Sequence, residues 1–539
     1  MKHERKLLAA AIVALFVGVG AAPLVEAHET GGAAKLGKLN FPVECNAAAQ
    51  KEFNLAMAYY HSFAWEVYKA PLERVLQADP TCGMAHWVRA LGMLDNPFVW
   101  PANLSPQILN DGQAALDAAR KTGLKTQRER DYVEALAAFF KDHDKLNHRA
   151  RAQALEAALE QVAQRYPDDK EATILYALVL SSNFDPADKK YTNQLKAAKT
   201  LEPIFVAQPD HPGVAHYLIH SYDYPPLAKQ GLEAAKRYSK IAPDAAHALH
   251  MPSHIFSRVG YWRESIEANR ASADAAKGSI PNKVHALDYM VFAQLQLGQD
   301  RAAAASIAEA KAIAKPGDHF ATAYGFAAMS ARYALERGAW KEAADLALYP
   351  AADAYGWQKF PQAEAINAFA RGVGAAMNKD PTNARVELTR LQQVRETAAA
   401  LKITYWVEQI DIQTDMVRGL ATYAEGKHDE AIAMLRKAAE REEATEKHVV
   451  TPGLIVPARE VLGRVMLEVA KPADALREFE AVIEREPNRY RAFAGALEAA
   501  ERAGDAKKTA HYSARLIELT ASADTPRAEI AHAKRLLGK

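Results

Sequence analysis

Apolar residues recur three and four positions apart along almost the whole chain, with charged and small polar residues between them. This spacing places the apolar side chains on one face of an amphipathic helix, whereas the alternating β-branched runs that predict strands are nearly absent. Many of these stretches are rich in Ala, which favours helices. The pattern therefore predicts an all-α chain made of successive helices.

The helical pattern repeats at intervals of about 34 residues. The clearest unit begins at Ala246, with Gly260 at the turn between its two helices and Ser265 where the second helix crosses the first. The unit before it has Gly231 at the crossing position and closes with Pro243. Turn and crossing residues recur in four later units: Gly298 with Ala303, Gly338 with Ala343, Gly426 with Ala431, and Ala470 with Ala475. A period of this length predicts a solenoid of stacked helical hairpins that share one core and leave a concave groove.

The chain has 539 residues, which is too long for one compact core and agrees with a solenoid. We expect an N-terminal extension over residues 28–44 and a first array of repeats over 45–349. An irregular helical connection over 350–400 and a second array over 401–539 follow.

Residues 1–27 have the features of a secretory signal peptide. Basic residues precede an apolar run from Leu7 to Gly20, and small residues lead to a cleavage point after Ala27. The alternative is a membrane anchor, but the run falls short of the roughly 20 apolar residues that span a bilayer. No later segment is long and apolar enough to span a membrane. We therefore expect a periplasmic or secreted mature protein.

The overall charge gives no reason to expect a nucleic acid or an anionic lipid as partner. Lys and Arg total 67 against 66 for Asp and Glu, a formal net charge of +1. A balanced chain lacks the long-range field that attracts such polyanions. Any partner must therefore be inferred from local sites.

The chain has two cysteines, Cys45 and Cys82. In an oxidising compartment they can form one disulfide, which we favour over two unpaired core thiols. Two thiols are too few for a Cys-rich zinc or iron–sulfur site.

Histidines are concentrated in the middle of the chain. Of 18 histidines, seven lie between His211 and His285. Their positions within the repeats match, because His216 and His250 are separated by 34 residues, as are His220 and His254. His216 and His220 are four residues apart, as are His250 and His254, so the two histidines within each repeat share one helical face.

The distinctive segments of the chain, HPGVAHYLIHSYDYP, HALHMPSHIFSRVG and TPGLIVPAREVLG, resemble a family of exported bacterial tetratricopeptide-repeat (TPR) proteins that has no assigned reaction. The resemblance covers most of the mature chain and implies a TPR-type α-solenoid. It also implies that positions 2, 5 and 9 of the first helix of each repeat face the groove. The residues expected there are His216, His220, His247, His250, His254, His285 and Asp288.

This set of side chains points to a transition-metal site. Neutral imidazole is a ligand for copper, zinc and iron, and six histidines are enough for two ions. Pro252 lies between His250 and His254, and we expect it to begin or kink a helix there. Neighbouring candidates for orienting the ligands or moving protons are Tyr217, Tyr222, Asp223, Tyr224 and Arg258, and His61 and His448 are candidates from distant repeats.

Two functional hypotheses remain. The first is a periplasmic TPR scaffold that binds a transition metal, and if it is an enzyme, it acts on a small molecule in the groove. The second is a non-catalytic adaptor that binds a peptide or a partner protein, with the histidines gripping a ligand or forming a polar network. The sequence contains no phosphate-binding loop, no GxSxG nucleophile elbow and no HExxH zinc-protease helix, which disfavours the familiar hydrolases and nucleotide-dependent enzymes.

Overall fold

The computed structural model describes residues 34–101 and 104–538, so the signal peptide predicted for residues 1–27 lies outside the described residues. The first half of the described chain consists of the following helices: α1 (Ala47–His61), α2 (Lys69–Ala78), α3 (Gly83–Met93), η1 (Pro97–Val99), α4 (Pro106–Thr122), α5 (Gln127–Phe140), α6 (His148–Arg165), α7 (Lys170–Ser182), α8 (Thr192–Ala207), α9 (Pro212–Tyr222), η2 (Ala228–Gly231), α10 (Leu232–Ile241), α11 (Ala246–His250), α12 (Pro252–Val259) and α13 (Trp262–Ala275).

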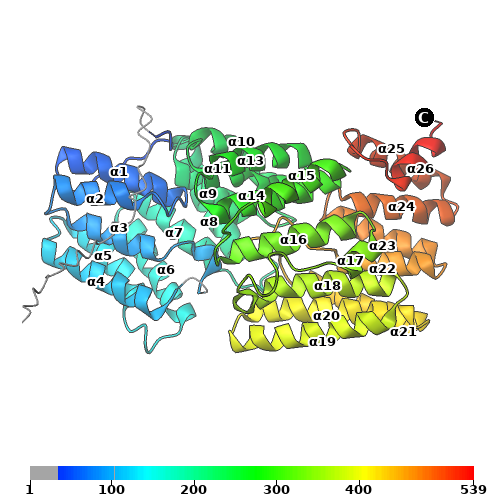
Figure 1. Cartoon of the computed structure of the whole chain (residues 1–539). Coiled ribbons are helices and arrows are strands. Elements are labelled where there is room, and N and C mark those ends of the chain that lie inside the picture. The colour runs from blue at the N-terminus through cyan, green and yellow to red at the C-terminus, as the bar shows by residue number, and fades with distance from the viewer. Residues whose placement is uncertain (1–33, 102–103, 539) are drawn as a thin grey trace, which may run out of the picture. The chain divides into compact units, whose positions relative to one another are not determined.

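The second half continues in the same way: α14 (Ile280–Gln296), α15 (Asp300–Lys311), α16 (Phe320–Glu336), α17 (Trp340–Ala344), η3 (Trp357–Lys359), α18 (Pro361–Met377), α19 (Pro381–Ala400), α20 (Thr404–Ala424), α21 (His428–Glu443), α22 (Ala458–Glu468), α23 (Pro472–Arg485), α24 (Tyr490–Arg502), α25 (Ala506–Leu519) and α26 (Ala528–Leu536). Most consecutive helices pack against each other, as α18 to α21 do in Figure 1. The described residues form an all-α solenoid of TPR type, which confirms the predicted fold class.

The predicted turn residues lie between the two helices of each hairpin. Their φ angles are positive, which favours glycine because it has no Cβ. Ala470, with φ 58°, is the one residue of this predicted set that is not glycine. The small crossing residues five positions later are fully buried where the helices meet, as the 0 % exposure of Ala303 and Ala475 illustrates. Turn and crossing residues together therefore fix the geometry of each hairpin.

The connection predicted as irregular over 350–400 differs from the structure. Residues 361–400 form two long regular helices, α18 and α19, and only the stretch before them is irregular. The turn between these helices has Lys379 at φ 61° where most of the predicted hairpins have glycine, and Ala384 is the small crossing residue five positions later. This hairpin lacks the turn glycine that marks most of the predicted hairpins.

The N-terminal segment is fixed to the repeats by contacts and by a disulfide. Phe41 is fully buried, and the backbone of Lys38 donates to the carbonyl of Asp210. Cys45 and Cys82 form the predicted disulfide, which ties this segment to the start of α3.

A loop over residues 444–457, between α21 and α22, crosses to the helices that carry the histidines. Tyr289 on α14 donates its hydroxyl to the carbonyl of Thr451, and Arg332 on α16 donates to the Thr451 hydroxyl. The loop brings Lys447 to Asp223, which follows α9. Residues separated by more than 200 positions therefore meet beside the histidine cluster.

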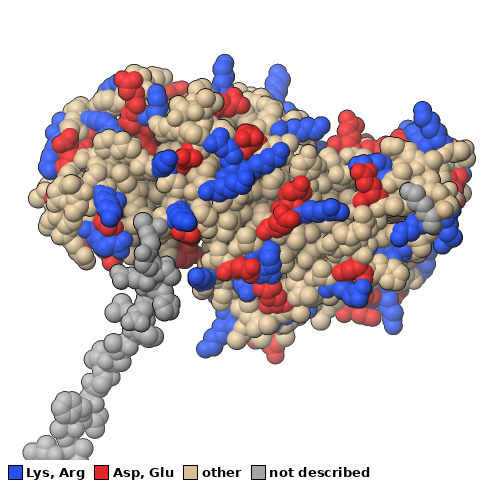
Figure 2. All heavy atoms as spheres, turned by 90° about the horizontal axis from the view of Figure 1, so that it is seen from above, with Lys and Arg blue, Asp and Glu red and all other residues tan. Residues whose placement is uncertain are grey.

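The surface agrees with the balanced composition. On the face drawn in Figure 2, basic and acidic side chains are interspersed. Within the described ranges, no helix has both the length and the apolar character needed to cross a membrane.

Candidate metal centre

The six predicted histidines form two groups of three, each with ligand nitrogens within 4.8 Å of one another. We name them the first triad and the second triad. The first triad comprises His216 and His220 of α9 and His247 of α11, and the second triad comprises His250 of α11, His254 of α12 and His285 of α14.

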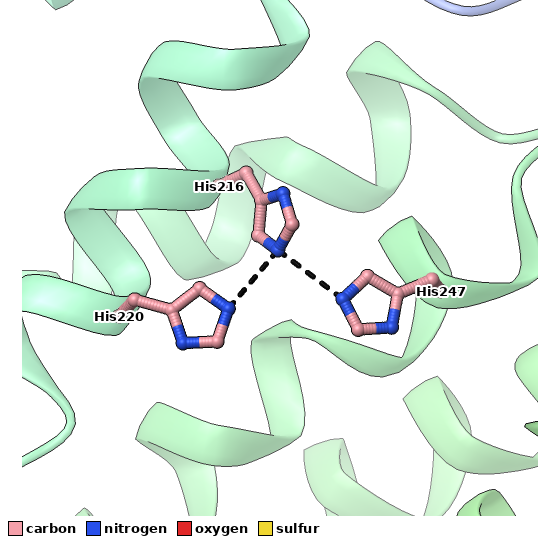
Figure 3. A group of neighbouring side chains, drawn as sticks. All are labelled: His216, His220 and His247. Atoms are coloured by element: carbon pink, nitrogen blue, oxygen red, sulfur yellow. Dashed lines mark hydrogen bonds between the residues drawn. The ribbon is translucent and has the colours of Figure 1, made fainter. Parts of the chain in front are cut away.

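The nitrogens of the first triad converge on His216. Its Nε2 lies 3.2 Å from Nε2 of His220 and 3.2 Å from Nε2 of His247 (Figure 3). His220 is one helical turn after His216, so both rings project from the same face of α9. His247 reaches them from the first helix of the next repeat.

The second triad is built across a break in the helix. Pro252 begins α12 and Met251 separates it from α11, as expected from a proline that cannot donate its backbone nitrogen. Nε2 of His250 nevertheless lies 3.1 Å from Nε2 of His254. The ring of His285 completes the triad at 4.4 Å from the ring of His250.

Three of the imidazoles are oriented by hydrogen bonds from their other nitrogen. Nδ1 of His216 donates to the carbonyl of His61 over 2.7 Å. Nδ1 of His250 donates to Oδ1 of Asn269 over 2.7 Å, and Nδ1 of His254 donates to Oδ2 of Asp223 over 2.9 Å. Metal-binding histidines have partners of this kind, because a fixed proton on Nδ1 leaves Nε2 free as a ligand.

The two triads adjoin each other. The ring of His220 lies 5.9 Å from that of His254, and the ring of His247 lies 6.1 Å from that of His250. All six rings therefore form one cluster, in which each triad contacts the other at two places.

The cluster is more enclosed than the predicted open groove. His216 is 0 % exposed and His254 is 2 % exposed, and only His247 and His285 are partly exposed. Aromatic rings cover it: Phe98 is stacked on His220 at 3.9 Å, Phe63 lies 4.4 Å from His216, and Tyr289 contacts the three rings of the second triad. The groove prediction was wrong in this respect, because Phe63 and Phe98, from the segments between the first helices, cover the cluster together with Tyr289 of α14.

Burial sets the charge state of the imidazoles. It lowers the pKa of all six below the usual value, and neighbouring imidazoles lower the pKa further in five of them. For His254 the burial effect is opposed by Asp223, which raises the pKa. The cluster therefore favours neutral imidazole, the form that binds metals.

Asp223 links the second triad to two buried cations. Its carboxylate accepts from Arg258 over 2.8 Å and from Lys447 over 2.9 Å, in addition to His254. Burial lowers the pKa of Lys447 to about 8, and Asp223 opposes that shift. Asp223 and Arg258 were candidates from the sequence, whereas Lys447 was not, although its neighbour His448 was a candidate from a distant repeat.

Asp288 does not join either triad, contrary to the prediction. Its carboxylate pairs with Arg332 of α16, and both side chains are buried. Burial raises the pKa of Asp288 to about 6, although Arg332 acts to lower it. The side chain points toward the neighbouring helix because a buried guanidinium is available there.

A third group of possible ligands lies behind the first triad. Glu171, at the start of α7, accepts from Nε2 of His211 over 2.7 Å and from Nε2 of His61 over 3.1 Å. Burial acts to raise the pKa of Glu171, but the two imidazoles lower it below the usual value. Glu171 was not predicted from the sequence, because it lies 45 positions before His216 and outside the matched repeat positions.

Of the remaining candidates from the sequence, Tyr217 lies beside the first triad, with its ring 5.2 Å from that of His216, and the others contact residues outside the triads. His448 packs against Trp406 at 4.9 Å, and Tyr222 donates to Glu202. Tyr224 contacts Tyr191 at 4.9 Å. Tyr217 contacts Nδ1 of His61 over 2.8 Å and so belongs to the Glu171 group.

No protein-family model matches the chain, and no curated protein matches it. Among solved structures, the chain is similar to one described as Naa15/Naa10 bound to HypK-THB, with 11% identity, a TM-score of 0.25, and coverage of 91% of this chain and 72% of that chain.

Two further solved structures match this chain over nearly the whole of their own length. The P58(IPK) TPR domain has 12% identity and a TM-score of 0.21, with coverage of 91% of this chain and 99% of that chain. A circular tandem repeat protein has 14% identity and a TM-score of 0.12, with the same coverage. Overlap at these scores assigns no activity to this chain.

Proposed function

We propose that this protein is a periplasmic TPR scaffold that binds transition-metal ions through its two histidine triads. The observation that carries the proposal is the contact between His250 and His254. Each ring donates from Nδ1, so the neutral form of each has a lone pair on Nε2, and these two nitrogens are 3.1 Å apart. Two lone pairs at this distance repel each other unless a cation lies between them.

The cation between the two nitrogens is better explained as a metal ion than as a shared proton. A proton is shared by two nitrogens, whereas His285 brings a third nitrogen within 4.8 Å of those of His250 and His254. In the first triad the lone pair of His216 likewise faces two nitrogens at 3.2 Å. Metal–imidazole bonds of about 2.0–2.1 Å fit three nitrogens at such separations.

The ligand set narrows the choice of metal without naming one. The six imidazoles supply nitrogen ligands, and among the described residues no carboxylate contacts both triads. Such a ligand set suits copper, zinc or iron better than magnesium or calcium, which prefer oxygen ligands. Three protein ligands leave a position on each ion open, which is the arrangement of catalytic rather than structural sites. A metal-dependent reaction on a small molecule is therefore compatible with the site.

Two observations support a periplasmic location. The N-terminal residues have the sequence features of a signal peptide. The disulfide between Cys45 and Cys82 is of a kind that persists in oxidising compartments and is rare in the cytosol.

A second function is favoured by a separate cavity of about 350 Å³ in the C-terminal half. Trp340 and Phe479 give it apolar walls, and Arg464 and Arg491 line it together with their ion-pair partners Glu498 and Glu529. Its volume is within the range of ligand pockets. An adaptor that binds a peptide or a partner protein would use this cavity and would not require the histidines.

Elemental analysis of the protein purified from the periplasm tests the first function. We expect stoichiometric copper, zinc or iron in the parent and loss of that metal in a His216→Ala/His250→Ala double variant. A His143→Ala/His511→Ala double variant, with both changes outside the triads, is the matched control and should retain the metal. Less than about a tenth of an equivalent in the parent after reconstitution would contradict metal binding and leave the adaptor.

A further inference from the structure

The two triads are neighbours, and this relationship has consequences for how they bind metal. Contacts between triads occur at two places, His220 with His254 and His247 with His250, at ring separations of 5.9 and 6.1 Å. Ions held by the two triads would therefore be adjacent rather than independent.

The protein supplies little negative charge to such a pair of ions. Within residues 34–101 and 104–538, the one carboxylate that accepts a hydrogen bond from any of the six imidazoles is that of Asp223. That carboxylate already pairs with Lys447 and Arg258, so these three side chains together carry a net positive charge. Glu171 is held by His61 and His211, and Asp288 is held by Arg332.

The charge of a loaded cluster must therefore be balanced from outside the protein. Two divalent ions on six neutral imidazoles carry four positive charges, and the cluster is buried under Phe63, Phe98 and Tyr289. Charge buried without a partner is strongly unfavourable. A small anion that binds both ions would neutralise part of this charge and occupy the open position on each of them.

Resting on the metal binding proposed above, we infer that the two triads form one dinuclear centre whose ions share a small anionic ligand, hydroxide or another anion of similar size. Paired ions in enzymes are bridged in this way at separations of roughly 3.5–4 Å. The enclosing aromatic rings restrict the bridging position to small ligands. The substrate class of the site is therefore a small oxygen-containing or similar anion, not a peptide.

Copper(II) and azide provide the test, because coupling between two copper(II) ions through a shared ligand suppresses their electron paramagnetic resonance (EPR) signal. The metal-free protein is loaded with two equivalents of copper(II), and the EPR signal is integrated. We expect a signal below about a fifth of that from two isolated ions, together with a new absorption band when azide is added.

Variants separate coupling from simple binding. His250→Ala, which removes a ligand of the second triad, should bind one copper with its full EPR intensity. His285→Ala, a partly exposed position less critical for folding, should give the same result, whereas the surface variant His511→Ala should behave like the parent. Two bound ions with the full signal of isolated copper, unchanged by azide, would overturn the dinuclear centre but leave metal binding intact. Failure of the parent to retain copper, zinc or iron would overturn the proposed function itself.

Discussion

Nδ1 of His254 donates to Oδ2 of Asp223 over 2.9 Å, which joins an imidazole of the second triad to the residue that follows the helix of the first triad. The same carboxylate accepts from Lys447, which lies 224 positions later in the sequence. His254 of the second triad is therefore oriented by a residue from the preceding repeat, and a loop from the C-terminal half pairs with that residue.

Replacement of Asp223 by Asn should weaken metal binding and destabilise the fold. The variant loses the charge that orients His254 and leaves Lys447 and Arg258 without their buried partner. We expect a 10- to 100-fold loss of metal affinity, about the size seen for outer partners of metal ligands. Competition with a coloured chelator measures this loss, and an affinity within about twofold of the parent would contradict the role assigned to Asp223.

The stability of the protein should depend on the protonation of Glu442. Burial raises the pKa of this carboxyl from 4.5 to about 8. Between these two pH values the folded state keeps a proton that the unfolded state has lost. The contribution of this proton to the free energy of unfolding is fully present below pH 4.5 and is lost as the pH rises through about 8.

Glu442→Gln should remove that pH dependence, because Gln is neutral throughout and still accepts from the backbone of Ala458. Between about pH 5 and about pH 8 the parent should lose about 3 kcal/mol more unfolding free energy than the variant. Urea unfolding at both pH values measures the difference. Glu440→Gln, at an exposed site on the same helix, is the control, and equal slopes for Glu442→Gln and the parent would contradict the buried state of Glu442.

Loss of the disulfide should destabilise the N-terminal repeats. Cys45 and Cys82 are separated by 37 positions, and a closed loop of this length restricts the unfolded chain. A Cys45→Ala/Cys82→Ala variant should lose about 2–4 kcal/mol of unfolding free energy. A parent protein whose unfolding curve is unaffected by reductant would show that the bridge contributes nothing.

The turn geometry of the repeats predicts a stabilising substitution at Ala470. Its φ of 58° is unfavourable for a residue with a Cβ, and the equivalent position is glycine in several other hairpins. Ala470→Gly should therefore raise the unfolding free energy by about 0.5–1 kcal/mol. Ala481→Gly, inside α23, should lower it by about 1 kcal/mol, and a destabilised Ala470→Gly would contradict the turn assignment.

The sequence predicts most of the fold because the repeats carry local signals. Glycines at the turns and small residues at the crossings identified the hairpins of α12 and α13, α14 and α15, and later pairs. The hairpin of α18 and α19 was missed because Lys379 adopts the left-handed conformation that glycine marks elsewhere. A turn signal based on glycine fails where the surrounding helices impose the conformation on another residue.

The sequence predicts only those residues of the candidate site that recur at matched positions of the repeats. Matched positions identified the six histidines, and the structure brings them together in two triads. The period carries no information on residues that reach the cluster from loops, such as Phe63 and Lys447, and so it could not predict that the cluster is enclosed. The assignment of Asp288 failed for a related reason, since its partner Arg332 lies 44 positions away on another helix.

Titration of the metal-free protein with copper(II) or zinc(II), with bound metal counted after dialysis, measures how many ions the two triads hold. We expect two ions per chain in the parent, one in His220→Ala, one in His254→Ala and two in the surface variant His511→Ala. Retention of no ion by the parent, or unchanged stoichiometry when either triad is altered, would contradict the claim that these six histidines form the metal site.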